Sequence, residues 1–439
     1  MSYGVIRGLL VGVAVVFGLA LCASLGVRTT GAMRLSSTTA RFEKEVGSLS
    51  LLDFVKQRIP QERNAVTWIR PGVLAVVLMN NDRAIVGTLA TKPTGEWTAK
   101  DFADLQPLLE RNEPAFTLLR RAQGMPESNW EVPYEQGNEA KLPDLLAAMN
   151  AGKLLAARGR AALARGDRET AIASAEILGT MAGSYEQEPA AIILLIGSAL
   201  ERQQLGIVRE IVMAPGVEAG ELDRLERSLP RGDLDAAFRN ALRGASASLI
   251  KSIHSEDIGK EFPRLIPRGL VVGLSELLAA QALDESMKLE PSMAGPIKAP
   301  LPDAQKAYED AAGGGWWRKA VAAYGPNIGN GRARGTATLS ARMLAQQAIG
   351  LRRAALETGR YPAKPGARVD PLSGEPFVYD ATADGVARLR STTTPEILKS
   401  IYTMGSPLTE QLYSWTLPPA SSRSTTPPLS PAGRKAASS

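Results

Sequence analysis

The residue types that most often carry chemistry are scarce in this chain. Among its 439 residues there is one histidine, His254, and one cysteine, Cys22. A zinc site of histidines and cysteines, a CxxC redox pair and an intramolecular disulfide all need more of them. A Ser-His-Asp triad would have to use His254, which lies beside Glu256 and Asp257. Because no nucleophile motif accompanies His254, we interpret it as a surface or helix-capping residue.

Three further groups of residues resemble functional motifs only in part. The glycines of the stretch from 329 to 335 lack the preceding strand and the G-x-G-x-x-G spacing of a dinucleotide-binding loop, so we interpret this stretch as a flexible linker. Acids two positions apart point in different directions on a helix, so they do not form a glycosidase pair. The tryptophans are expected to anchor the core, with a ligand surface as the alternative. The groups are Gly329-Asn330-Gly331 with Gly335; Glu43/Glu45 and Asp233/Asp235; and Trp68, Trp97, Trp130, Trp316 and Trp317. The sequence therefore assigns no catalytic residue, no metal ligand and no cofactor.

Composition favours a helical protein that does not bind nucleic acid. Hydrophobic residues make up 44% of the chain but aromatic residues only 5%, so the core is built mainly from Ala, Leu, Ile and Val. That balance favours closely packed helices over a β-sandwich. The net charge is +6, but 51 basic and 45 acidic residues are interleaved. A nucleic-acid partner is not predicted, because no basic run with stacking aromatic residues is present.

The amino-terminal region carries a membrane signal. From Gly8 to Val27 the chain runs for twenty residues without a charge, between Arg7 and Arg28. At about 1.5 Å per residue, such a helix spans the roughly 30 Å hydrocarbon core of a bilayer. Residues 1–30 are therefore predicted to be a retained single-pass anchor, with the membrane as partner of residues 8–27. A cleaved signal peptide is the alternative, because small residues surround Cys22.

Residues 31–140 are predicted to be a helical region with a linker. Thr98, with Asp101 three residues later, forms an imperfect capping box, so a helix should begin there. The expected elements are a helix over Phe42–Arg58, a short strand or buried helix over Val73–Met79, and helices over Thr98–Asn112 and Pro114–Ala122.

Residues 141–285 are predicted to be a body of helical hairpins. Gly166-Asp167 combines a C-cap glycine with an N-cap acid, which indicates a turn between two helices. The segment ARGDRETAI at this turn is echoed by PRGDLDAAF 66 residues later, as in tetratricopeptide-type hairpins and α-solenoids. Ala190–Leu200 is apolar but only eleven residues long, which predicts a buried helix rather than a second span. Gly269–Leu283 is predicted to be another core helix.

The carboxyl-terminal part divides into three segments. Residues 286–335 are rich in proline and glycine and are predicted to be a connector. Residues 336–404 combine a long helix, Thr338–Glu357, with a β-hairpin across Asp384-Gly385. Residues 405–439 are rich in Ser, Pro and Thr and are predicted to be disordered. The expected fold class is mainly α: a transmembrane helix, a solenoid-like body, and a small helix plus β-hairpin.

One segment resembles a known family. The run ALETGRYPAKPGARVDPLSGEPFVYD is similar to the end of bacterial membrane-anchored proteins of planctomycete type, with the pattern G-x-Y-P followed by D-P-x-[ST]-G-x-P-[LF]-x-Y. The same pattern resembles the end of type II secretion major pseudopilins, and its specific part is Gly359–Tyr379. The chain lacks the pseudopilin cleavage site and the glutamate that follows it. The resemblance therefore implies a local C-terminal fold, an N-terminal anchor and a helical body outside the cytoplasm, with no known enzymatic activity, but not pilus assembly.

A calcium site near this segment is not expected. Asp380 and Asp384 offer two carboxylates, whereas calcium takes six to eight oxygen ligands. Solvated turn residues are the favoured interpretation.

These observations favour a non-catalytic, membrane-anchored scaffold or protein-interaction protein of the bacterial envelope. A protein partner is expected on the helical body, because hairpin arrays leave a groove between repeats. The expected location is the inner membrane with a periplasmic body, although Arg28, Arg34 and Arg41 mildly favour a cytoplasmic one. The alternatives are a carboxylate-dependent hydrolase whose site the sequence does not identify, and an accessory component of a type II secretion-like system.

Overall fold

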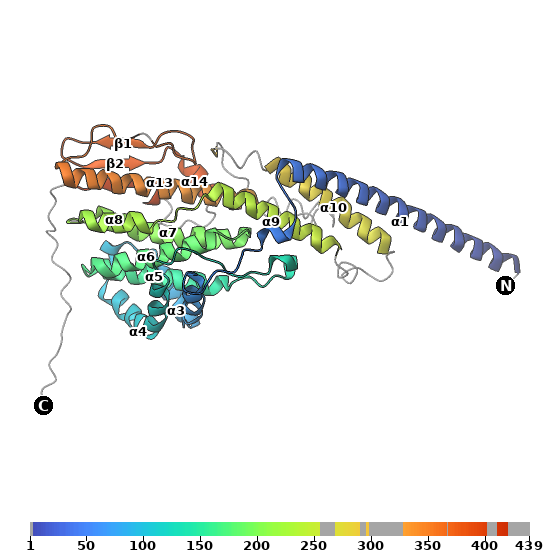
Figure 1. The fold of residues 1–439 in the computed structure, drawn as a ribbon, viewed down its shortest axis with the longest axis horizontal. Helices are drawn as coiled ribbons and strands as arrows, with labels where there is room; N and C mark the ends of the chain where they lie inside the picture. The colour runs from blue at the N-terminus through green and yellow to red at the C-terminus, as the bar shows by residue number, and fades with distance from the viewer. Residues whose placement is uncertain are drawn as a thin grey trace, which may run out of the picture.

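A computed structural model describes the backbone of residues 3–254, 268–289, 296–297, 328–366, 368–401 and 411–419. These residues form a mainly helical molecule with one small antiparallel sheet near the carboxyl end (Figure 1). The predicted fold class is confirmed at this level, whereas the solenoid arrangement of the body stays a prediction.

The first helix, α1 (Tyr3–Glu45), is continuous and contains the whole predicted span, Gly8–Val27. It ends where Gly47 adopts a φ of +129°, in the region that favours glycine. A short 3₁₀ turn, η1 (Leu51–Phe54), follows, and the chain then runs without a helix to Pro60. The predicted helix over Phe42–Arg58 is therefore wrong beyond Glu45, because the positive φ at Gly47 ends the helical path.

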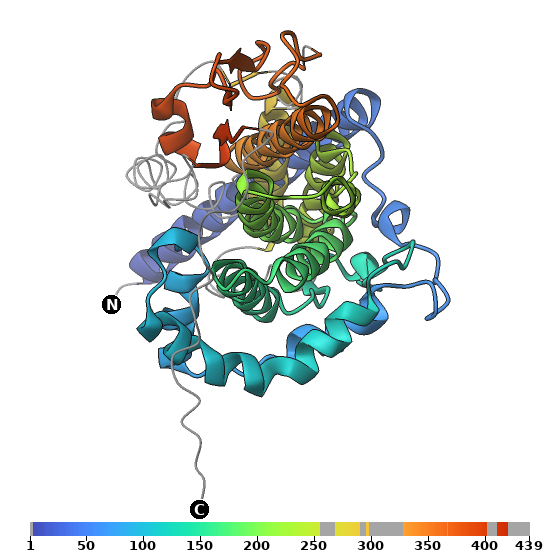
Figure 2. The ribbon, with the colours of Figure 1, turned by 90° about the vertical axis from the view of Figure 1, so that its left-hand side faces the viewer.

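Helices α2 (Val66–Leu74), α3 (Asn80–Leu89) and α4 (Ala99–Arg121) curve around one side of the body (Figure 2). The predicted start of α4 is confirmed, because Thr98 accepts a hydrogen bond from the backbone N–H of Asp101 and Asp101 accepts one from Thr98. The predicted break before Pro114 is wrong. The helix continues through this proline, since its buried face packs into the core on both sides of it.

The apolar run Val73–Met79 forms neither a strand nor a buried helix. Helix α2 ends at Leu74, and the chain then crosses the side chain of Asn112 on α4. The Asn112 side-chain oxygen accepts a hydrogen bond from the Val77 N–H at 2.7 Å, and the Asn112 side-chain amide donates to the Val77 carbonyl at 3.2 Å. A fully buried side-chain amide thus satisfies this loop, a long-range contact that local periodicity does not report.

The centre of the body consists of α5 (Leu145–Ala164), α6 (Arg168–Glu186), α7 (Ala191–Met213) and α8 (Ala219–Ser228). The predicted turn between α5 and α6 is confirmed. Gly166 has a φ of +81°, and Asp167 caps α6 by accepting a hydrogen bond from the Thr170 N–H at 3.0 Å. The later turn is similar, because Asp233 caps the following helix by accepting from the Ala236 N–H.

Helix α7 contains the apolar segment that was expected to be buried. Among the helices whose side chains are fully described, it is the one long and apolar enough to cross a membrane, yet 61% of the apolar window is buried inside the molecule. It packs against α6 and against α13 (Ile328–Thr358). These contacts support its interpretation as a core helix, although it is longer than predicted.

Helices α9 (Leu234–His254) and α10 (Arg268–Leu289) extend toward the long first helix (Figure 1). Helix α10 packs mainly against α1 and α9, in a separate apolar cluster that includes Phe42 and Leu283. Arg41 on α1 forms an ion pair with Asp284 on α10. The predicted core helix over Gly269–Leu283 is therefore present, but it supports α1 more than the centre of the body.

The sheet lies beside α13 and α14 (Pro395–Ile401). It consists of β1 (Val378–Ala381), β2 (Ala387–Arg390) and β3 (Ser414–Leu417) in that order, all antiparallel. The hairpin across Asp384-Gly385 is confirmed, with a φ of +79° at Gly385. The third strand lies inside the segment predicted to be disordered. It is ordered because Trp415 and Leu417 are buried.

The predicted connector, residues 286–335, lies largely outside the described residues. Its last part is helical, because α13 begins at Ile328 and includes Gly329-Asn330-Gly331 and Gly335. The interpretation of these glycines as a flexible linker is therefore wrong. Gly335 packs against Phe238, where an added Cβ would lie 2.0 Å from the ring carbon Cε2.

Candidate functional site

A pocket of about 450 Å³ lies between two segments of the body that are far apart in sequence. One side is formed by the chain after η1, and the other by the loop that leads into η3 (Tyr134–Glu139). Glu188, just beyond α6, also lines the pocket. The volume falls in the range of small-ligand sites. The lining residues are Phe54, Val55, Lys56, Arg58, Asn129, Glu131, Val132, Pro133, Tyr134, Glu135 and Glu188.

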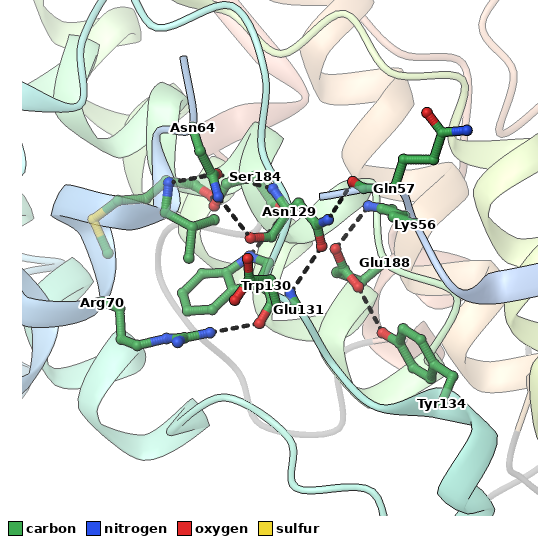
Figure 3. A network of polar contacts seen from close by, with 12 residues as sticks. Lys56, Gln57, Asn64, Arg70, Asn129, Trp130, Glu131, Tyr134, Ser184 and Glu188 are labelled. Carbon is green, nitrogen blue, oxygen red and sulfur yellow. Dashed lines mark hydrogen bonds and ion pairs between the residues drawn. The ribbon is translucent and has the colours of Figure 1, made fainter. Parts of the chain in front are cut away.

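The Glu188 carboxylate is held by two donors (Figure 3). It accepts a hydrogen bond from Lys56 Nζ at 2.7 Å and one from the Tyr134 hydroxyl at 2.7 Å. Its side chain is only 1% exposed, so both partners compensate the cost of burying the charge. Burial is the main cause that raises the pKa of Tyr134 well above its usual range, and the neighbouring Glu188 carboxylate raises this pKa further. The phenol therefore stays protonated and donates.

Lys56 presents donors to the pocket. Its side chain is 29% exposed, and its ammonium group carries three N–H donors. Among the described residues, this ammonium group donates a hydrogen bond to Glu188 and to no other residue. The remaining donors are thus available to an acceptor group in the pocket. Because both Glu188 oxygens already accept hydrogen bonds, the arrangement suits binding better than proton abstraction by this carboxylate.

Two buried asparagines join the sides of the pocket (Figure 3). The Asn64 amide donates to the Asn129 carbonyl at 3.0 Å, and the Asn64 side-chain oxygen accepts from the Asn129 N–H at 3.0 Å. The Asn129 amide in turn donates to the Gln57 carbonyl at 2.9 Å. Trp130 behind them donates to the Ser184 carbonyl at 3.2 Å. These bonds fix the loop against the segment that carries Lys56.

Glu131 at the rim of the pocket has a strained backbone. Its φ is +52°, which makes it the one non-glycine residue in the described part of the chain with a positive φ. The Asn129 side chain accepts from the Glu131 N–H at 2.8 Å, and the buried Trp130 next to it fixes the path. The Glu131 side chain is 48% exposed and lies 3.6 Å from Arg58. Such strain is concentrated at functional sites, where surrounding contacts maintain it.

A second charged cluster lies in the core. The Arg342 guanidinium on α13 donates to Glu186 at 2.6 Å and to Glu201 at 2.7 Å, which joins α13 to α6 and α7. Burial, and then the adjacent Glu201 carboxylate, raises the pKa of Glu186 well above its usual range. All three side chains are at most 3% exposed, so the cluster is inaccessible to a ligand and serves the fold.

The scarce residues singled out from the sequence are not part of the pocket. Cys22 is exposed on α1. His254 is the last residue of α9, and its side chain lies outside the described residues, as do Glu256 and Asp257. The pairing of His254 with these acids is therefore not tested.

The tryptophans follow the core interpretation where they are described. Trp97 and Trp130 are 7% and 2% exposed, and Trp130 supports the pocket from behind. Trp68 is half-buried, with the Arg121 guanidinium 4.8 Å from its ring centroid. Trp316 and Trp317 lie outside the described residues.

The acids considered for chemistry lie at helix ends and turns. Asp233 caps α9 and Asp235 lies in its first turn, whereas Glu43 near the end of α1 accepts from the Leu49 N–H. Asp384 accepts hydrogen bonds from the Thr382 hydroxyl and the Val386 N–H within its turn. Glu45 and Asp380 are exposed. Within the described residues, no group of three or more His, Cys, Asp or Glu side chains is arranged to hold a metal ion.

The residues of the family-like segment have structural contacts. Asp370 is fully buried and accepts hydrogen bonds from the Leu372 N–H and the Ser391 hydroxyl, which closes the turn before β1. The Tyr361 hydroxyl donates to the Pro418 carbonyl at 2.7 Å, and the Tyr379 hydroxyl donates to the Pro362 carbonyl at 2.7 Å. The segment therefore organises the C-terminal tip.

No protein family, no curated protein and no solved structure matches the chain.

Proposed function

We propose that the protein is a non-catalytic scaffold of the bacterial envelope, held in the inner membrane by α1 and presenting its helical body to a protein partner. The observation that supports this most directly concerns the contact between α1 and α10. Among the described elements, α10 packs against α1 from Ser24 onward, within one helical turn of Val27, where the sequence-predicted span ends.

The contact between the two helices begins at Ser24 and is unusually close. An added Cβ on Gly269 would lie 2.8 Å from the Ser24 hydroxyl oxygen, and one on Gly273 would lie 2.6 Å from Arg28 Cα. An added Cβ on Gly31 would lie 2.4 Å from the Gly273 carbonyl oxygen. Real Cβ atoms do not approach this closely, so the pairing depends on glycine at these positions.

On the amino-terminal side of this contact, the α1 backbone extends away from the other described elements (Figure 1). Cys22 and Ala23, directly before Ser24, are exposed. The predicted span, Gly8–Val27, begins in this extended part of the helix and ends within the first turns of the α10 contact. An apolar segment of this length, beside which no other described element lies, is suited to a lipid environment. Two independent boundaries, one from packing and one from sequence, thus agree within a helical turn.

The periplasmic location of the body is the part of the proposal that rests on resemblance. The segment Gly359–Tyr379 resembles proteins whose bodies lie outside the cytoplasm. The arginines Arg28, Arg34 and Arg41 favour the opposite orientation by the positive-inside rule. Topology is therefore the decisive property to measure.

The single cysteine gives a direct test. In the native chain, a membrane-impermeant maleimide should fail to label Cys22 in intact membranes and should label it after denaturation. A C22A/K100C variant moves the only thiol to α4, where the Lys100 side chain is 80% exposed. We expect this thiol to be labelled in intact cells whose outer membrane has been permeabilised.

Each other result contradicts a defined part of the proposal. Labelling of Cys22 in intact membranes would place it outside the bilayer. Labelling of the Lys100→Cys thiol only after lysis would place the body in the cytoplasm. The mass of the membrane-extracted protein should include Met1 or the residue that follows it, and a mass lacking the first two dozen residues would show cleavage.

A further inference from the structure

The segment Val55–Arg58, beside the pocket, has unused hydrogen-bonding groups. The Gln57 carbonyl accepts from Asn129 and so faces the body. Within the described part of the chain, no hydrogen bond engages the backbone N–H of Lys56 or Arg58. Backbone groups of this kind are obligatory hydrogen-bonding partners, filled either by water or by another chain. An added polypeptide segment is a recurrent way to fill them.

Apolar surface continues from the pocket along the same segment. Phe54 forms one side and is 7% exposed, whereas Val55 at the rim is 47% exposed and Leu52 just outside is 70% exposed. On the opposite side, Val132 and Pro133 are also apolar. A pocket with apolar sides next to exposed apolar residues is suited to a partner side chain rather than to water.

Four of the five charged residues that line the pocket are paired, Lys56 with Glu188 at 2.7 Å and Arg58 with Glu131 at 3.6 Å. The fifth, Glu135, leaves the lining with one carboxylate in excess. An anionic ligand would meet this excess and would have to compete with a carboxylate for Lys56 or Arg58. A neutral amide carbonyl would not, because it can accept from the donors that Lys56 has left over. The polar groups therefore match a peptide backbone better than a phosphate or a nucleic acid.

The backbone strain at Glu131 indicates that the pocket is kept in one shape. The Asn64–Asn129 pair and Trp130 hold the loop although the φ of Glu131 is unfavourable. A preformed site loses less conformational entropy when a flexible segment binds. This feature favours a partner that orders on binding, such as a peptide.

From these features we infer that the pocket binds an unstructured segment of a partner polypeptide, which places one apolar side chain between Phe54 and Pro133 and lies with its backbone along Val55–Arg58. A carbonyl of the bound segment accepts from Lys56. This inference rests on the proposed scaffold function, because it names the kind of partner that the body holds.

The test uses the purified full chain and a display library of random linear peptides as the probe. Enriched peptides are synthesised with a fluorophore, and their affinity is measured by fluorescence polarisation. We expect a shared apolar residue and at least a tenfold weaker affinity for V55D and for L52D. The matched control is L146D, because Leu146 is also exposed, at 62%, but lies on α5. Its affinity should stay within twofold of the native value.

Three results would overturn the inference: no enriched peptide, equal binding to V55D and to the native chain, or a consensus defined by charge alone. Both substituted residues are exposed, and circular dichroism establishes that the variants are folded. Because the assay uses detergent-solubilised protein, its outcome is independent of the topology measurement. Peptide binding with a cytoplasmic body would contradict the envelope location but not this site, and a confirmed anchor without peptide binding would do the reverse.

Discussion

At the scale of single residues, two glutamates are held in an unfavourable state by their neighbours. For Glu131 it is the backbone conformation that is unfavourable, and for Glu186 it is the burial of a carboxylate. Glu131 has a left-handed backbone at the rim of the pocket, and Glu186 is a buried carboxylate next to a second one. The two differ in what maintains them. Hydrogen bonds to a loop fix the first, whereas a single guanidinium, Arg342, holds the second. Each therefore predicts a different response to substitution.

Replacing Glu131 with glycine should stabilise the protein relative to replacing it with alanine. Glycine adopts a φ of +52° without the steric cost that a Cβ carries, which is about 1 kcal/mol for such a residue. The side-chain contact to Arg58 is lost in both variants, so their difference reports the backbone. Denaturant unfolding measures it. An E131G variant that is less stable than E131A would show that the backbone is not strained.

The buried Glu186 predicts a pH dependence. Its pKa is raised from an ordinary value of 4.5, so the folded state binds a proton more readily than the unfolded state. Where the folded state binds more protons, the free energy of unfolding falls as pH rises. The contribution of Glu186 is therefore largest below its ordinary pKa and is lost as pH rises through the raised value.

E186Q should remove this slope, as measured by urea unfolding at a series of pH values. The control is E169Q. Arg224 lowers the pKa of Glu169, so its small stabilising contribution has the opposite sign and is lost as pH falls. A slope unchanged in E186Q would show that this carboxylate is charged in the folded protein.

At the scale of helices and strands, local signals were predictable and tertiary ones were not. The capping box at Thr98, the turn at Gly166-Asp167 and the hairpin at Gly385 each depend on a few adjacent residues. The continuation of α4 through Pro114 and the strand β3 depend on burial against distant elements. Such burial overrides local propensity, and a single sequence does not display it.

Gly335 shows how the same residue type can mislead. In the local sequence, a glycine-rich stretch indicates a linker. In the structure, the absence of a side chain at Gly335 lets the ring of Phe238 pack against α13. G335A should destabilise the protein by about 1–3 kcal/mol through overpacking. G350A on the same helix should stabilise it by up to about 1 kcal/mol, because nothing lies within 4 Å of the added Cβ and alanine is the better helix former. Thermal unfolding measures both, and effects of equal sign would contradict this account.

At the scale of the whole molecule, the candidate site could not have been predicted. Lys56 and Glu188 are 132 residues apart, and Tyr134 and Glu188 are 54 apart. None of the three lies in a motif, and their charges resemble ordinary surface residues until the fold brings them together. The helix that carries the predicted anchor, in contrast, could be predicted, because its signal is one uninterrupted apolar run; the membrane insertion of this helix stays a prediction.

The close approach of α1 and α10 can also be tested by replacing glycines and measuring stability. G273V should weaken it, because the added Cβ would lie 2.6 Å from the α1 backbone at Arg28. We expect a loss of about 1–3 kcal/mol and a lower unfolding midpoint of the protein in lipid nanodiscs. G26V is the matched control on α1, where an added Cβ meets nothing within 4 Å. Equal midpoints for the two variants would show that the two helices do not depend on close approach.

The continuity of α1 has a mechanical consequence. Between Arg28 and Glu45 the helix continues for about 27 Å, at a rise of about 1.5 Å per residue, and α10 braces it. A body joined to its anchor by a flexible linker would rotate freely above the bilayer. A body joined to its anchor by a continuous, rigid helix would instead tilt together with the anchor. With α1 anchored in the membrane as proposed, the mouth of the pocket would then stay at a nearly constant height above the bilayer. Partners confined to the same membrane would meet it at a high effective concentration and in one orientation.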